Sequence, residues 1–180
     1  MKEEIHEMHE HAHAAHSDTS LIPITVTLSI LAVLVAIISL AGHRSHTEEL
    51  LNQNKATDQW AYYQAKNIRS HSYAQFLDLL AVIPLKDEAT GEKLKQKYEK
   101  ELDRYKDEQA DIEKEARKLE QETEMESKKA NRYDLGEILL EAALVITSIT
   151  LITKWRAFWY VGLILGVSGI VVGTLGLLVT

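Results

Sequence analysis

The sequence predicts an all-α membrane protein with three transmembrane helices and an antiparallel coiled-coil hairpin between the first and the second. Three observations lead to this fold class. Three segments of about 20 residues are almost entirely apolar, the stretch between the first two carries a heptad repeat, and the 180-residue chain has only two prolines. An apolar helix of about 20 residues crosses a hydrocarbon core of about 30 Å, and scarce proline permits long uninterrupted helices.

The composition excludes several classes of chemistry. The chain has no cysteine, which excludes disulfides, thiolate metal sites and a cysteine nucleophile. Its formal charge is −7 and no basic stripe stands clear of acidic neighbours, so nucleic acid is not an expected partner. No serine–histidine–acid arrangement, phosphate-binding glycine loop or HExxH motif is present. We therefore expect no enzyme, and assign no catalytic or cofactor-binding residue.

Residues 1–20 form a leader rich in histidine and glutamate. His6, His9, His13 and His16 are spaced by threes and fours, so a helix would align them on one face. Neutral imidazoles in this arrangement can share a divalent transition metal such as Zn²⁺, Cu²⁺ or Ni²⁺. Short histidine-rich tracts are also compositional signals. A metal or proton sensor and a solvated leader that binds metal adventitiously therefore both stay open.

The first predicted span covers residues 21–41 and contains no charge. Pro23 falls in its first turn, where a helix tolerates the missing N–H. The polar residues 42–44 are expected to mark the water interface.

Residues 47–134 are predicted to form the helical hairpin, with arms at about 47–83 and 92–134. Pro84 ends the first arm and residues 87–91 form the loop. Apolar positions in the second arm recur at threes and fours, the spacing of a coiled-coil seam. These seam positions are Leu94, Tyr98, Leu102, Tyr105, Gln109, Ile112, Ala116, Leu119, Thr123, Glu126, Ala130 and Tyr133.

Two helices joined by a short loop run antiparallel, which sets the pairing of the arms. Folding the arms about residue 88 places Trp60 near Ala116 and Gln64 near Ile112. Near the membrane, Thr123 and Glu126 stand where a seam normally has leucine. A third helix or a neighbouring subunit is expected to support this end.

The second predicted span, residues 135–153, carries two acidic residues in its first two turns. Glu137 and Glu141 are spaced i, i+4 and so share a helix face. An ionisable residue inside a span is costly and is by default a functional hypothesis. The alternative is that the span begins near Ala142 and both carboxylates sit at the interface.

The third predicted span, residues 158–179, carries a glycine stripe. Gly162, Gly166, Gly169, Gly173 and Gly176 are spaced four, three, four and three, which keeps them on one face. Small residues are what allow helices to approach closely in lipid. We expect another helix, in this chain or in another subunit, to pack on this face.

Three spans place the hairpin and the C-terminus on one side of the membrane and the N-terminus on the other. Lysine and arginine near the membrane are more numerous on the hairpin side. The positive-inside rule therefore predicts a cytoplasmic hairpin and C-terminus and an external N-terminus.

Residues 58–69 read DQWAYYQAKNIR. With the histidine-rich leader and the C-terminal pair of spans, this WxYYQAK segment resembles a family of uncharacterised bacterial inner-membrane proteins catalogued as a domain of unknown function. The resemblance implies a multi-pass protein of the bacterial inner membrane and carries over no activity.

The segment itself supports two interpretations. In the first, Trp60 and Tyr63 are hairpin core while Lys66 and Arg69 are solvated. In the second, stacked aromatic and cationic side chains, with Gln64 beside them, form a conformational or subunit contact.

The function expected from these features is a homo-oligomeric bacterial inner-membrane scaffold with a projecting hairpin, whose partners are membrane lipid and further copies of the chain. The alternative is an ion channel or transport assembly lined by Glu137, Glu141 and the hydroxyl side chains of the second span. A third class is a metal- or pH-responsive sensor that uses the leader.

Overall fold

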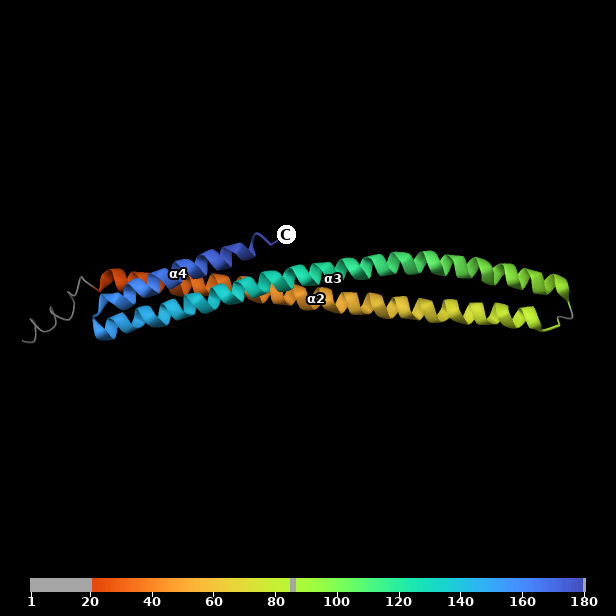
Figure 1. Cartoon of the computed structure of the whole chain (residues 1–180), viewed down its shortest axis with the longest axis horizontal. Helices are drawn as coiled ribbons and strands as arrows, with labels where there is room; N and C mark the ends of the chain where they lie inside the picture. The colour runs from red at the N-terminus through yellow and green to blue at the C-terminus, as the bar shows by residue number, and fades with distance from the viewer. Residues whose placement is uncertain (1–20, 85–86, 180) are drawn as a thin grey trace, which may run out of the picture. The chain divides into compact units, whose positions relative to one another are not determined.

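The computed structural model describes residues 21–84 and 87–179, which form three helices and, within those ranges, no strand. The helices are α2 (Ile22–Val82), α3 (Glu88–Thr153) and α4 (Arg156–Gly176) (Figure 1). Each contains a segment long and apolar enough to cross a membrane. The predicted all-helical class is thus confirmed, together with three helices of spanning length.

The chain divides into two compact units. The apolar unit comprises the described residues up to Ser45 together with those from Lys128 onward, and contains parts of α2 and α3 and all of α4. The polar unit is His46–Ser127 and contains the remaining parts of α2 and α3. Helices α2 and α3 have 61 and 66 residues, so each carries an apolar segment and a polar arm without a break.

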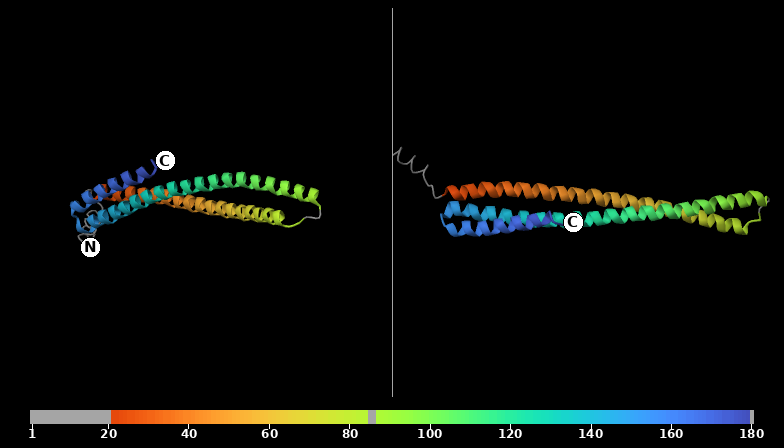
Figure 2. Two further views of the ribbon diagram at one scale, coloured as in Figure 1. Left: turned by 45° about the vertical axis from the view of Figure 1, so that its right-hand side comes forward. Right: turned by 90° about the horizontal axis from the view of Figure 1, so that it is seen from above.

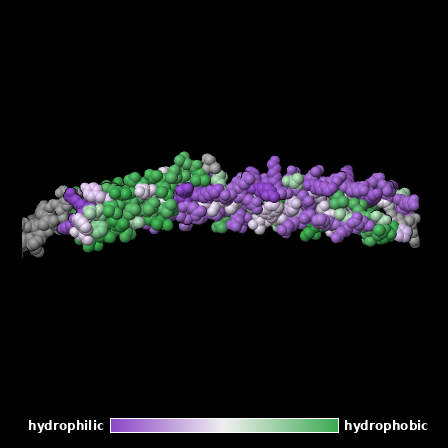
Figure 3. Space-filling model, viewed as in Figure 1, coloured by the Kyte–Doolittle hydropathy of each residue, from purple (hydrophilic) through white to green (hydrophobic). Residues whose placement is uncertain are grey.

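In the apolar unit, α2, α3 and α4 pack side by side (Figure 2). Leu31, Leu140 and Ala143 form the buried centre. Six partly buried apolar residues surround it: Leu34, Val35, Ile38, Leu144, Leu165 and Ile170. The surface of this unit is also largely hydrophobic (Figure 3), because large apolar side chains such as Ile30, Val145 and Ile164 remain exposed.

The connection between α3 and α4 is a tight turn at Lys154 and Trp155. Lys154 has a φ of 53°, in the left-handed region that side chains other than glycine rarely adopt. Its N–H donates to the Thr150 carbonyl at 2.9 Å, and the Trp155 N–H donates to the Thr153 hydroxyl at 3.3 Å. Helix α4 begins at Arg156 and ends at Gly176, slightly before the predicted limits of the third span.

In the polar unit, the α2 and α3 segments run antiparallel and contact each other. All ten seam positions of this unit, from Leu94 to Glu126, are buried or half-buried. The seam was predicted from spacing alone, and it is the face that α3 turns toward α2.

The connection between α2 and α3 differs from the predicted loop at 87–91. Helix α2 ends at Val82 and α3 already begins at Glu88, so Gly91 is helical and buried. Asp87 explains the early start, because its carboxylate accepts from the Ala89 N–H at 3.2 Å and from the Thr90 hydroxyl. These bonds cap the helix and hold the pKa of Asp87 below its ordinary value.

Candidate functional site

The WxYYQAK segment lies on α2 within the polar unit and contacts α3 at two places. At the first, the Trp60 indole N–H donates to the Glu120 carboxylate at 2.8 Å. The Arg117 guanidinium lies 5.8 Å from the Trp60 ring centroid, and Tyr63 packs edge-on against Trp60 at 5.6 Å. Trp60 thus meets the turn of α3 that follows Ala116, its predicted neighbour.

The second contact centres on Lys66, whose ammonium lies 2.5 Å from the Glu108 carboxylate. The Lys66 side chain is only 12% exposed, and its ammonium lies 5.3 and 5.0 Å from the ring centroids of Tyr62 and Tyr105. The hydrogen bond to Glu108 raises the pKa of Lys66, and Lys66 lowers the pKa of Glu108. The interpretation of Lys66 as a solvated residue is therefore wrong.

Beyond Lys66, a row of aromatic rings continues toward the end of α2. Tyr105 stacks on Tyr73 at 5.6 Å, Tyr73 contacts Tyr98 at 5.2 Å, and Tyr98 packs edge-on against Phe76 at 4.9 Å. The hydrogen bond to Tyr105 raises the pKa of Tyr73. Aromatic pairs in these arrangements contribute about 0.5–1.5 kcal/mol beyond their buried area. The row fixes the pairing of the arms over several turns.

Two predicted contact residues, Gln64 and Arg69, are exposed and lie outside this seam. The seam also holds one unsatisfied polar group, because the buried Gln109 amide nitrogen has no hydrogen-bond partner in the described chain. Toward the other end of the polar unit, Thr123 helps to line a groove of about 290 Å³ beside Trp60 and Ala56. The groove lies where the seam was predicted to weaken.

The glycine stripe of α4 packs within its own chain. All five glycines are buried. A Cβ at Gly169 would lie 2.9 Å from the Gly136 carbonyl oxygen, and one at Gly162 would lie 3.0 Å from the Ala143 carbonyl oxygen. A Cβ at Gly166 or Gly173 would instead meet the side chain of Leu31 or Ile38 on α2. The stripe is therefore covered within the chain itself.

Sequence reasoning missed Gly136, the glycine of α3 that faces this stripe. A Cβ there would lie 2.9 Å from the Gly173 nitrogen and 3.0 Å from the Gly169 carbonyl oxygen, so α3 and α4 touch backbone to backbone. A single glycine in a span has no spacing pattern that could have revealed it.

The hydroxyl and carboxyl groups of the second predicted span lie on two faces of α3. Thr147 and Thr150 are fully buried, and their hydroxyls have no partner in the described chain. Glu141 is exposed on the opposite face, between Ile138 and Val145, which are 60% and 58% exposed. The carboxyl and hydroxyl groups expected to line the path of a channel are thus divided between the core and the outer surface of the apolar unit.

The two glutamates have no polar partner in the described chain. Glu137 is half-buried and Glu141 exposed, and neither has a hydrogen bond or an ion pair within residues 21–84 and 87–179. A carboxylate surrounded by exposed apolar side chains is unusual on a surface of this composition.

The leader histidines His6, His9, His13 and His16 lie outside the described residues. Among the residues that are described, no three histidine, aspartate or glutamate side chains gather as a metal site would require.

These features define an all-helical protein. Its three helices each contain a segment long and apolar enough to cross a membrane. In its polar unit, aromatic and ionic contacts join α2 to α3. The family described as Domain of unknown function (DUF4337) matches residues 20–179, and the chain belongs to it. Membership of an uncharacterised family, predicted from the WxYYQAK segment, is confirmed. No curated protein and no solved structure matches the chain.

Proposed function

We propose that this protein is a homo-oligomeric scaffold of the bacterial inner membrane. In this proposal α4 and the apolar segments of α2 and α3 cross the bilayer, and the polar arms form a coiled-coil hairpin in the cytoplasm. The C-terminus shares the cytoplasmic side and the N-terminus is external, in accordance with the positive-inside rule. The proposal assigns the chain no reaction.

The observation that carries the proposal is the position of Glu141. Its side chain is exposed in the middle of an apolar outer face of α3. A lone copy in a bilayer would present this carboxyl group to acyl chains, and an ionisable side chain facing lipid inside a span is costly. A second copy packed on this face removes that contact and offers the group a hydrogen-bond partner.

The test is whether Glu141→Leu lowers the mass of the solubilised particle or instead raises its stability without changing its mass. If the face is covered by another copy, this substitution removes an interhelical hydrogen bond and should lower the mass of the detergent-solubilised particle. If each copy is alone in lipid, it removes a carboxyl group from the hydrocarbon, so stability should rise with no change in mass. Glu99→Leu on the exposed surface of the polar unit is the matched control. A wild-type particle with the mass of one chain would refute the proposal.

The same position supports a second candidate function, a channel or transport assembly. Glu137, Glu141 and Ser148 share the outer part of α3, so several copies could enclose a path between them. Purified protein in planar bilayers should be electrically silent as a scaffold. Single-channel steps that disappear in Glu141→Gln would establish the channel instead.

A further inference from the structure

Helix α2 of the polar unit has an outer side, turned away from α3, that carries a continuous row of uncharged residues. These residues are separated by threes and fours, which places them on one helix face. All of them are exposed, and four are large apolar residues. We call this set the outer face of α2: Leu50, Asn54, Thr57, Ala61, Ala65, Ile68, Ser72, Gln75, Leu79 and Val82.

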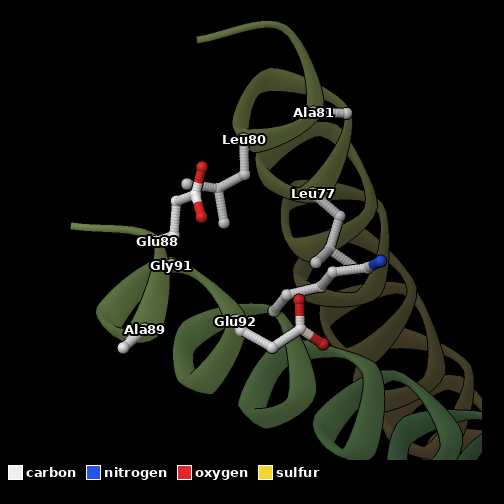
Figure 4. Close-up of a pocket in the computed structure, with 8 residues that line it drawn as sticks. Leu77, Leu80, Ala81, Glu88, Ala89, Gly91 and Glu92 are labelled. Carbon is white, nitrogen blue, oxygen red and sulfur yellow. The ribbon is translucent and has the colours of Figure 1, made fainter. Parts of the chain in front are cut away.

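The side of α2 that contacts α3 is the opposite one. Figure 4 shows this near the end of the arm, where Leu77 and Leu80 line a groove of about 570 Å³ together with Glu88 of α3. Leu79 and Val82 each follow one of these leucines by two residues, which is about 200° around an α-helix. They are 49% and 76% exposed. The α3 helix of the same chain therefore leaves the outer face of α2 uncovered.

The outward side of α3 has the reverse character. Residues 88–127 of α3 include 23 charged side chains, whereas residues 46–82 of α2 include seven. The charged side chains exposed on the outward side of α3 include Lys100, Asp107, Lys114 and Lys118. Water suits this side of the polar unit. The outer face of α2 instead has the uncharged mixture of large and small residues that is typical of a contact between helices.

Symmetry explains why a second copy suits the outer face of α2. Copies anchored in one membrane share an orientation, so their arms run parallel at the same height. A two-fold contact between them sets identical residues opposite each other. On the outward side of α3 this would oppose lysine to lysine and aspartate to aspartate, which repel. On the outer face of α2 it opposes only uncharged residues, so this face is complementary to itself.

We propose that two copies of this chain pack through their outer faces of α2, parallel and in register. Ala61 and Ala65 let the two helices approach closely, and Ile68 supplies apolar contact. The two Asn54 amides hydrogen-bond across the contact and fix its register, as a seam asparagine does in other helix pairs. The inference rests on the proposed homo-oligomer and adds a contact outside the membrane to the one at Glu141.

Other occupants fit the outer face of α2 less well. Anionic membranes attract clusters of basic residues, and none of the ten residues of this face is basic. A different protein would not require a face free of charge, because unlike partners can pair opposite charges. Only a contact between identical parallel helices requires it.

The absence of cysteine from the chain permits a direct test by cross-linking. Membranes containing the full-length chain with Ala65→Cys are treated with a short bismaleimide, and a dimer is expected. Ala110→Cys on α3 is the matched control and should give no dimer. Both alanines are exposed, and they lie at similar heights because the neighbouring residues Lys66 and Glu108 pair with each other.

The register is tested with two differently tagged chains. Leu79→Cys should also form a dimer with itself. Ala65→Cys co-expressed with Leu79→Cys should give no dimer that contains both tags, because the two positions lie about 21 Å apart along the helix.

A charge placed on the outer face of α2 should disrupt the contact. Ala61→Glu, added to the chain with Ala65→Cys, opposes two carboxylates and should lower the dimer yield about tenfold. Ala110→Glu in the same chain should leave the yield unchanged. Circular dichroism confirms that all variants keep their helix content.

Any of four results would overturn the inference. They are no dimer with Ala65→Cys, an equal dimer with Ala110→Cys, an undiminished dimer with Ala61→Glu, and cross-linking of Ala65→Cys to other proteins only. A dimer containing both tags would refute the register. If the solubilised particle holds more than one chain while Ala65→Cys gives no dimer, the inference fails and the proposed oligomer stands. If the particle is a single chain, both fail.

Discussion

The Lys66 ammonium and the Glu108 carboxylate lie 2.5 Å apart across the polar unit, with the rings of Tyr62 and Tyr105 beside the cation. The pair joins residues 42 positions apart in the chain, so it holds α2 and α3 in one pairing. A shift of one helix by a single turn would move both Glu108 and Tyr105, which lie on α3, away from Lys66 on α2. The pair therefore specifies the register of the two arms. Polar residues in the seams of other helix pairs have the same effect.

We predict that this pair stabilises the arms between about pH 4.5 and pH 10.5. Its contribution is lost in alkali as Lys66 deprotonates, because its pKa is raised above the ordinary value of 10.5. It is lost in acid below the ordinary value of 4.5, because the pKa of Glu108 is lowered. Hydrogen exchange of the arms should be slower in the wild type than in Lys66→Met within this window, and the difference should shrink at both ends. A difference that is constant with pH would contradict the assignment.

Trp60 is predicted to act mainly through its ring. Trp60→Phe keeps an aromatic ring beside Arg117 and Tyr63 and loses only the N–H donated to Glu120, an exposed carboxylate that water can serve instead. We expect a loss of about 1 kcal/mol or less in the free energy of unfolding. Trp60→Ala removes the half-buried ring and should cost about 2–3 kcal/mol. Urea unfolding followed by circular dichroism measures both, and equal losses would show that the hydrogen bond dominates.

The groove beside Trp60 provides a position at which the protein can be stabilised. Thr123 occupies a seam position and its hydroxyl donates to the Leu119 carbonyl within the same helix, so it fills little of the groove of about 290 Å³. Thr123→Leu should raise the free energy of unfolding by about 0.5–2 kcal/mol through cavity filling. Thr57→Leu, at the opposite edge of the same groove and exposed, is the control and should change stability less. A destabilised Thr123→Leu would show that the groove cannot accept the larger side chain, which would contradict the prediction.

How far sequence predicts this molecule depends on whether a feature repeats. The seam from Leu94 to Glu126 was predictable because apolar residues recur at a fixed period, and the glycine stripe because five glycines share one spacing. The Lys66–Glu108 pair has no such signal, since contacts across two helices depend on a register that single residues do not reveal. For this reason the sequence left both interpretations of Lys66 open, as a solvated residue and as part of a contact.

The first predicted span and the first predicted arm form one helix. Residues 42–44, which are expected to mark the water interface, lie inside α2, which continues through them. Gly42 lies where a Cβ would come 3.3 Å from the Cβ of Tyr133 on α3, so its small size serves helix contact instead of a break. The exposed apolar end of α2 also went unrecognised, because an apolar run at a helix end reads as core until its exposure is known.

Replacing glycine by alanine in the apolar unit should have effects that depend on what each Cβ would meet. A Cβ added at Gly136 would meet only backbone atoms of Gly169 and Gly173. These atoms cannot move without separating α3 from α4. We expect Gly136→Ala to cost about 1–3 kcal/mol. At Gly166 it meets the terminal methyl of Leu31, which can rotate, so the gain in helix propensity of about 1 kcal/mol should offset the strain. Thermal unfolding in detergent compares the two variants, and a larger loss for Gly166→Ala would contradict the backbone contact.

The turn between α3 and α4 offers a test that involves backbone strain alone. Lys154 adopts a φ of 53°, which costs roughly 1–2 kcal/mol for most residues and less for asparagine. Lys154→Asn should therefore leave thermal stability in detergent equal or higher. Lys154→Val, whose branched side chain is poorly compatible with this conformation, should lower stability by about 1–2 kcal/mol. The neighbouring substitution Trp155→Val separates strain from lost side-chain contacts, since Trp155 has a φ of −92° that valine adopts readily. If Lys154→Val were as stable as the wild type, the turn would have to rearrange without loss, and the left-handed residue would not determine how α4 returns along α3.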